Sequence, residues 1–285
     1  MKIIKLKSPA KLNLYLKVVG KRHDGFHELK TIFERIDLAD TLRFTEMVNG
    51  KINIQCIHPQ VPLGPKNLVY KVADLLRRDF GISQGVTIQI DKNIPVAAGL
   101  AGGSSNAAIT LMGLNQLWRL GLGQKELVEY AKKIGSDVPF FLYDCSWALG
   151  TGRGDIISPM KIETKLWHVL VVPKMRMLTP KVYGAMNLKL TKFGDDVNIL
   201  TRYLGQNDVV KIGSLLRNDL EGPISFLKPS LLKIKRKIEA LNAVGTAFSG
   251  SGPSIFSVIE SRKAAVEIYK QLKRQYRQVF IVKTL

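Results

Sequence analysis

The sequence predicts an α+β protein with two lobes. Strand and helix patterns mix along the 285 residues without the regular alternation of a doubly wound sheet. The hydrophobic fraction of 46% is enough to build a sizeable core. Motifs that carry chemistry become sparse in the region of residues 158–166. We therefore expect an N-terminal domain over residues 1–160 and a C-terminal domain over residues 161–285.

The individual elements follow from the spacing of apolar residues. In the first half we expect strands at 2–19, 29–36, 41–44, 51–57 and 86–90 and helices at 66–80, 106–120 and 124–134. Asp24 and Gly25 form a turn signal between the first two strands. In the second half we expect strands at 167–172, 255–259 and 279–282 and helices at 179–186, 208–216, 228–241 and 262–276.

The composition limits the classes of protein to consider. The two cysteines, Cys56 and Cys145, lack metal-ligand spacing, so a reducing cytoplasm is the expected compartment. The N-terminus alternates lysine with apolar residues, unlike a signal peptide, and no apolar run approaches the roughly 20 residues of a membrane helix. The histidines lack a cysteine cluster or a helical His pair, which argues against zinc. We expect a soluble intracellular protein without a membrane partner.

The net charge of +20 is unevenly distributed. Over residues 228–283 we count 12 basic and 3 acidic residues, mostly on expected helices. Such an excess attracts nucleic acid, anionic membranes or anionic substrates, although a solvated lysine-rich face is the more common explanation. The basic stretches lack interleaved aromatic residues and an RNA motif. A nucleic-acid partner is therefore an alternative that the sequence does not favour.

The strongest functional signal is the run PVAAGLAGGSS at residues 95–105, between an expected strand and an expected helix. Glycines let a backbone approach an anion closely, and a helix N-terminus offers N–H groups and the positive end of the helix dipole. The run matches neither G-x-x-x-x-G-K-[ST] nor G-x-G-x-x-G. We interpret it as a phosphate-binding loop of another kind; a glycine turn with a serine N-cap is the alternative.

Two polar residues and one turn are candidates for the chemistry and for recognition. Asp137, in GSDVPF, is either a general base for a substrate hydroxyl or a helix cap, and both roles can hold together. Lys11 shares one face of an alternating strand with Asn13, although a lone strand lysine is usually solvated. The turn KRHDGFH at 21–27 suits a flat anionic ligand, or it is a solvated hairpin.

Three motifs of the chain, one of them a second glycine- and serine-rich loop, occur in the order typical of GHMP kinases, the superfamily of galactokinase, homoserine kinase and mevalonate kinase. They are PAKLN near the start, PVAAGLAGGSS in the middle and SGSGPS near the end. The chain resembles this superfamily over essentially its whole length. The run KRHDGFHELKTIFERIDLADTL, together with GSDVPFF and GTGRGD, resembles members that act on a cytidine diphosphate-linked polyol. The resemblance implies a two-lobed kinase with ATP and substrate in the cleft between its lobes.

The resemblance also implies roles for single residues. Asp137 would take the proton from the substrate hydroxyl, and Lys11 would stabilise charge beside it. Asn67 would lie near the base of ATP, and Asn13 would face the polyol. The loop that holds the ATP phosphates would comprise Pro95, Ala97, Gly99, Leu100, Ala101, Gly102, Gly103, Ser104 and Ser105. The cytidine pocket would comprise Phe26, His27 and Tyr183. Mg²⁺ is expected with ATP, and its ligands are not assigned beyond Ser104 or Ser105 as candidates.

The chain departs from the family pattern at a few positions. The family usually has glycine, aspartate, tyrosine and glutamate where this chain has Ala101, Asn106, Phe26 and Asp155. Ala101 would be strained if its position needs a positive φ. None of these changes removes a proposed catalytic group. Phosphoryl transfer needs in-line positioning and charge stabilisation, which a glycine loop, a helix N-terminus, a lysine and Mg²⁺ supply.

Two alternatives stay beside this interpretation: a nucleic-acid-binding protein, and a GHMP kinase for another small alcohol such as mevalonate or homoserine. The turn at 21–27 discriminates against the second, because those substrates carry no cytosine. The expected partner is a small molecule, and the chain is expected to be a monomer or a homodimer.

Overall fold

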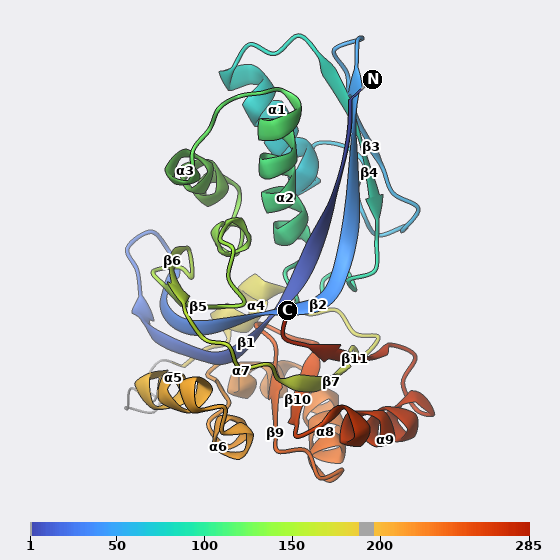
Figure 1. Ribbon diagram of the computed structural model, residues 1–285. Helices are drawn as coiled ribbons and strands as arrows, with labels where there is room; N and C mark the ends of the chain where they lie inside the picture. The colour runs from blue at the N-terminus through green and yellow to red at the C-terminus, as the bar shows by residue number, and fades with distance from the viewer. Residues whose placement is uncertain (1, 188–196) are drawn as a thin grey trace. The chain divides into compact units, whose positions relative to one another are not determined.

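The computed structural model describes residues 2–187 and 197–285, and the chain separates into two compact units. Unit 1 contains residues 1–10, 38–96 and 101–144, and unit 2 contains residues 11–37, 97–100 and 145–285. The long strands β1 (Ile3–Lys21) and β2 (His27–Met47) contribute residues to both units (Figure 1). The mixture of helices and sheets confirms the predicted α+β class. The domain boundary at residue 160 stays a prediction.

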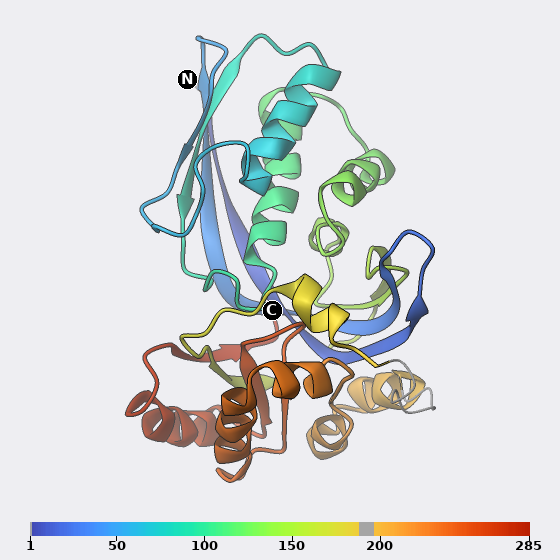
Figure 2. The same cartoon turned by 180° about the vertical axis from the view of Figure 1, so that it is seen from behind.

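Unit 1 consists of strands covered by helices. β3 (Ile52–Gln55) runs parallel to β4 (Gly85–Asp91), and β4 pairs antiparallel with the end of β2. The helices α1 (Leu68–Asp79), α2 (Gly102–Leu117) and α3 (Gln124–Ile134) pack together on one side of these strands (Figures 1 and 2). A short 3-10 helix, η1 (Pro139–Leu142), follows α3. Most of α2 is buried, which explains why its apolar residues show little helical periodicity.

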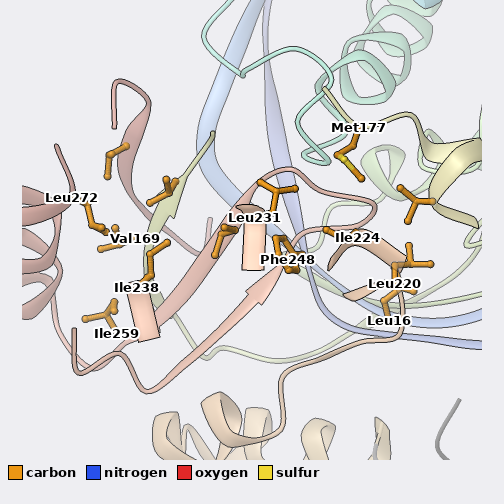
Figure 3. Packing of buried hydrophobic residues seen from close by; sticks show 14 of the residues in the cluster. Leu16, Val169, Met177, Leu220, Ile224, Leu231, Ile238, Phe248, Ile259 and Leu272 are labelled. Atoms are coloured by element: carbon orange, nitrogen blue, oxygen red, sulfur yellow. The ribbon is translucent and has the colours of Figure 1, made fainter. Parts of the chain in front are cut away.

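Unit 2 contains a four-stranded antiparallel sheet with the strand order β11–β7–β10–β9. Its strands are β7 (Trp167–Val171), β9 (Gly245–Phe248), β10 (Ile255–Ile259) and β11 (Val279–Lys283). The helices α8 (Pro229–Glu239) and α9 (Arg262–Lys273) pack against this sheet. Figure 3 shows how Leu231 and Ile238 of α8 and Leu272 of α9 meet the sheet residues in one apolar core.

Two further strand segments of unit 2 pair with the second half of β1 and the first half of β2. The hairpin β5 (Trp147–Thr151) and β6 (Ile156–Met160) pairs with β2, and β8 (Arg217–Asn218) lies parallel to β1. The remaining helices are α4 (Thr179–Gly184), α5 (Val197–Gln206), α6 (Val209–Ser214) and α7 (Glu221–Leu227). Over residues 2–187 and 197–285, no helix has both the length and the apolar character that crossing a membrane requires.

The structure differs from the predicted elements at several places, three of which bear on the fold. The strands predicted at 29–36 and 41–44 are one continuous strand, β2. The polar stretch between them is not a turn, because the buried carboxylate of Asp40 accepts hydrogen bonds from the backbone N–H groups of Asn93 and Ile94. The helix predicted from residue 106 starts earlier, at Gly102. The hairpin β5–β6 was not predicted, because glycines interrupt its strand pattern. Its strand β5 is stabilised by backbone pairing with β2, which the local pattern does not show.

Candidate active site

Three segments that are far apart in the sequence meet around Gly250 in unit 2. A β carbon built on Gly250 would lie 3.4 Å from Asn13 Oδ1, 3.5 Å from Gly99 O and 3.5 Å from Lys11 Nζ. The backbone N–H of Lys11 also donates to Leu100 O at 3.2 Å. One site in space is therefore formed by the PAKLN strand, the Gly99–Leu100 part of the glycine-rich run and the SGSGPS loop.

The two loops at this site are held together by close backbone packing. Gly99 has a φ of 78°, and a β carbon there would come within 2.2 Å of Ser249 O, so only glycine fits. Ser249 Oγ donates to Gly99 O at 2.9 Å. The side chain of Asn218 donates to Phe248 O at 2.9 Å and to Gly250 O at 2.8 Å. These contacts fix the position of the glycine-rich loop relative to the SGSGPS loop.

Lys11 and three neighbours form what we call the Lys11 cluster: Lys11, Asn13, Thr31 and Phe33. Lys11 Nζ donates to Asn13 Oδ1 at 2.5 Å, and Asn13 Nδ2 donates to Thr31 Oγ1 at 2.8 Å. Nζ also lies 5.5 Å from the centroid of the Phe33 ring. Lys11 is 4% exposed, so the alternative of a solvated surface lysine is excluded. A buried ammonium needs such partners, because its desolvation is costly.

In unit 1, the N-terminus of α2 has the geometry of an anion site. Ala101 is the N-cap residue, with a φ of 54° in the left-handed region. In the described parts of the chain, the backbone N–H groups of Gly102, Gly103 and Ser104 have no hydrogen-bond acceptor. A β carbon on Gly103 would meet no atom within 4 Å. Open space beside N–H groups at the positive end of a helix suits a phosphate.

The two serines of this first turn differ in their surroundings. Ser105 is fully buried, and its Oγ lies 2.8 Å from Ser8 Oγ. Ser8 Oγ donates to Asn106 Oδ1 at 2.6 Å. Asn106 therefore keeps a carbonyl acceptor where the family usually has a carboxylate. Ser104 is only partly buried, which leaves it as the better placed of the two candidate Mg²⁺ ligands.

Asp137 lies half-buried in the turn between α3 and η1, in unit 1. η1 begins at Pro139 with Val138 as its N-cap residue, and no side chain caps it. Asp137 is therefore not the N-cap residue that the capping alternative requires. The role of general base is a proposal that this position leaves open.

Asn67, also in unit 1, is the N-cap residue of α1. Its Oδ1 accepts from the N–H of Val69 at 2.9 Å, and its Nδ2 donates to Pro62 O at 2.7 Å. Both polar ends of the amide are thus used within the protein. A groove of about 550 Å³ in unit 1 has Lys92 and His58 in its lining, and Asn67 is not part of that lining. The contact of Asn67 with the base of ATP stays a prediction.

The residues expected to bind cytidine form what we call the ring cluster: Phe26, His27 and Tyr183. The rings of His27 and Tyr183 stack, with centroids 5.0 Å apart and planes at 30°. Phe26 is 49% exposed, and the Arg153 guanidinium lies 4.9 Å from its ring centroid. Burial lowers the pKa of His27, and the positive charge of Lys21 lowers it further, which favours the neutral imidazole at pH 7.

Sequence reasoning missed several residues around these motifs. Asp40 binds Lys92 at 2.7 Å beneath the start of the glycine-rich run, and burial lowers the pKa of Lys92 although Asp40 opposes this shift. Thr31 holds Asn13, and Arg153 covers Phe26. The only available signal was a polar residue inside an apolar strand pattern, as at Thr31 and Asp40 in TIFERIDLAD.

A buried lysine, a glycine-rich backbone and an open helix N-terminus define a class of protein that handles phosphate groups. The family models for the GHMP kinases N terminal domain and the GHMP kinases C terminal region match residues 67–145 and 200–278. The chain belongs to the GHMP kinase family. Both matching models describe kinases, so these matches do not support the alternative of a nucleic-acid-binding protein.

Individual relatives narrow the comparison. A protein named 4-diphosphocytidyl-2-C-methyl-D-erythritol kinase from Bacillus cytotoxicus is 42% identical over 286 residues, covering 100% of this chain and 98% of the relative. A protein of the same name from Brevibacillus brevis is 40% identical over 282 residues, covering 99% and 96%. A crystal structure of 4-(cytidine 5'-diphospho)-2C-methyl-D-erythritol kinase matches with a TM-score of 0.84 and 31% identity, covering 98% of each chain.

A more distant match shows only the fold. The crystal structure of L. major mevalonate kinase in complex with R-mevalonate has a TM-score of 0.77 at 15% identity, covering 99% of this chain and 95% of that one. The shared fold by itself therefore does not select the substrate.

Proposed function

We propose that the chain is an ATP-dependent kinase that phosphorylates a hydroxyl of 4-diphosphocytidyl-2-C-methyl-D-erythritol, a step in non-mevalonate isoprenoid precursor biosynthesis. The observation that carries the proposal is the meeting of Lys11, Asn13, Gly99 and Gly250 in one site. Full-length relatives of that name, at 40% and 42% identity, support the choice of substrate.

In the proposed reaction, Asp137 accepts the proton of the substrate hydroxyl. The hydroxyl oxygen then bonds to the γ-phosphorus of ATP, and the bond from that phosphorus to its bridging oxygen breaks to release ADP. Lys11 stabilises the negative charge that is spread over the transferred group. Its burial strengthens this effect, because the local dielectric constant is low. The N–H groups at the start of α2 hold the phosphates.

Mg²⁺ would neutralise phosphate charge when it binds together with ATP. Among the residues that the structure describes, no three His, Cys, Asp or Glu side chains gather into a metal site. This fits an ion held mainly by phosphate oxygens and water, as is usual for Mg²⁺ with nucleotides. Ser104 is the candidate protein ligand, because Ser105 is buried against Ser8.

The ring cluster would recognise the cytidine. Stacking of a base on an aromatic ring contributes about 1–3 kcal/mol, and Phe26 is 49% exposed although Arg153 lies against its ring. His27, beside it in the same turn, would hydrogen-bond the edge of the base. A site built for cytosine rejects uracil, because the exchanged donor and acceptor leave polar groups unpaired.

A coupled ADP-release assay tests this function. The substrates are the cytidine compound, its uridine analogue, mevalonate and homoserine. We expect turnover of the cytidine compound to exceed that of all the others. Equal kcat/KM for the cytidine and uridine compounds would contradict base recognition, and faster turnover of mevalonate or homoserine would assign the chain another small alcohol.

We further propose that the enzyme works in the cytoplasm on small molecules alone. Cys56 and Cys145 form no disulfide bond, in keeping with a reducing compartment. The positive charge of the chain favours capture of a substrate that carries a diphosphate. Whether the chain is a monomer or a homodimer stays a prediction.

A further inference from the structure

A chain of hydrogen bonds runs from the ammonium of Lys11 to the backbone of β1. Lys11 Nζ donates to Asn13 Oδ1 at 2.5 Å, and Asn13 Nδ2 donates to Thr31 Oγ1 at 2.8 Å. The hydroxyl of Thr31 donates to Tyr15 O at 2.7 Å. Lys11, Asn13 and Thr31 are 4%, 2% and 1% exposed, so water cannot readily replace these bonds.

The position of the single hydroxyl proton of Thr31 decides which group donates and which accepts in each of these hydrogen bonds. The carbonyl oxygen of Tyr15 can only accept, so the proton of Thr31 points to it. Toward Asn13 the Thr31 oxygen can then only accept, and it must face the amide nitrogen. The amide oxygen of Asn13 therefore faces Lys11. In the reverse orientation, amide N–H groups would face an ammonium, and two donors would oppose each other.

We propose that Thr31 is a positioning residue for phosphoryl transfer, because its hydroxyl orients the Asn13 amide and thereby fixes the Lys11 ammonium. The ring of Phe33 and the backbone at Gly250 lie close to the same ammonium. The effect of Thr31 on turnover rests on the proposed function, whereas its effect on the state of Lys11 does not. Thr31 itself contacts neither substrate in this scheme; it acts through Asn13.

The test compares Thr31→Val with Thr31→Ser. Valine has the shape of threonine without the hydroxyl, and serine keeps the hydroxyl. We expect kcat to fall about 10- to 100-fold in Thr31→Val, because the released Asn13 amide no longer holds its hydrogen bond to the charged Lys11 ammonium, with a much smaller change in KM for ATP. Thr31→Ser should stay close to the parent protein. Lys11→Met should lose at least as much kcat as Thr31→Val.

A matched control separates this effect from a general loss of stability. Thr164 is also buried in unit 2, and its hydroxyl also donates to a backbone carbonyl, that of Leu204. Thr164→Val should lower the thermal midpoint about as much as Thr31→Val while leaving kcat near the parent value. Equal losses of kcat in both valine variants would overturn the positioning role.

A second measurement needs no substrate. The rate at which acetic anhydride modifies the Lys11 amine at fixed pH is followed by peptide mass spectrometry. An ammonium that loses a hydrogen-bond acceptor gives up its proton more easily, so labelling should be faster in Thr31→Val, where the Asn13 amide is no longer held against Lys11, and unchanged in Thr31→Ser. Unchanged labelling in Thr31→Val would overturn the proposal, even if turnover falls. If the parent protein does not turn over the cytidine compound, the proposed function fails, and labelling alone decides the role of Thr31.

Discussion

The Lys11 cluster and the ring cluster belong to the same unit, but they are held in different ways. Lys11, Asn13 and Thr31 are buried and joined by hydrogen bonds of 2.5 and 2.8 Å. Phe26 lies on a hairpin turn with the Arg153 guanidinium against its ring, and Tyr183 lies on a six-residue helix, where it stacks on His27 and packs against the apolar core. One cluster is held by directional hydrogen bonds, and the other by contacts of aromatic ring faces, which depend less on exact geometry.

This difference matches the two tasks of a kinase. Stabilising a transferred phosphoryl group requires a charge in a fixed place before the substrate arrives, because reorganisation during the reaction costs rate. Recognition of a base tolerates adjustment on binding, because stacking depends weakly on exact geometry. Substitutions in the reacting residues should therefore act on kcat, and substitutions in the ring cluster should act on KM.

The largest effect is expected at Asp137, which tests the reacting side of the comparison. Asp137→Asn removes the proton acceptor, and kcat should fall about 10²- to 10⁴-fold in the ADP-release assay, the usual range for a general base. ATP binding, measured by nucleotide titration, should survive. Asp208→Asn is the control, because asparagine caps α6 as well as aspartate does. Near-normal turnover of Asp137→Asn would remove Asp137 from the chemistry.

The next largest effect is expected at the start of α2. Gly103→Val places a branched side chain in the open space beside the free N–H groups, so affinity for ATP should fall about 10- to 100-fold as one phosphate contact is blocked. Gly102 is a poorer test, since a β carbon there would already approach Ile94 Cγ2 at 2.9 Å. Gly222→Val is the matched control: Gly222 lies in the first turn of α7 and also faces open space. Retained ATP affinity in Gly103→Val would contradict a phosphate site there.

A smaller effect is expected in the ring cluster. Phe26→Ala and Tyr183→Ala should each raise KM for the cytidine compound about 5- to 150-fold, the range that corresponds to loss of about 1–3 kcal/mol of stacking. The KM for ATP and kcat should change little. Phe226→Ala controls for loss of an exposed phenyl ring, since Phe226 is 79% exposed on α7. A drop in kcat without a change in KM would erase the distinction between the clusters.

The smallest effect concerns stability at the junction between the glycine-rich run and α2. Ala101 has a φ of 54°, where an alanine side chain is strained and glycine is not. Ala101→Gly should raise the free energy of unfolding by about 0.5–1 kcal/mol, measured by urea denaturation. Ala107→Gly, inside α2, should lower it by a similar amount. Destabilisation in both variants would show that the Ala101 side chain contributes more than its strain costs.

Much of this could be predicted from local patterns. The helix predicted at 124–134 and the strand predicted at 255–259 have the observed bounds, because each pattern lies between clear turn residues. The strain at Ala101 followed from the rule that a left-handed residue is usually glycine. Predictions failed where distant partners decide the outcome, as at Asp40, whose backbone partners Asn93 and Ile94 lie more than fifty residues away.

The sequence by itself determined the α+β class, the family and the identity of the motif residues, because periodicity, glycine positions and motif order are local properties of the chain. Only the tertiary structure decided that Lys11 is buried, that Gly250 meets Lys11 and Asn13, and that Thr31 orients the Asn13 amide. A strand pattern states which side chains share a face, and it does not state what covers that face. The partners of a buried polar group are chosen by long-range packing, which one sequence does not encode in any local pattern.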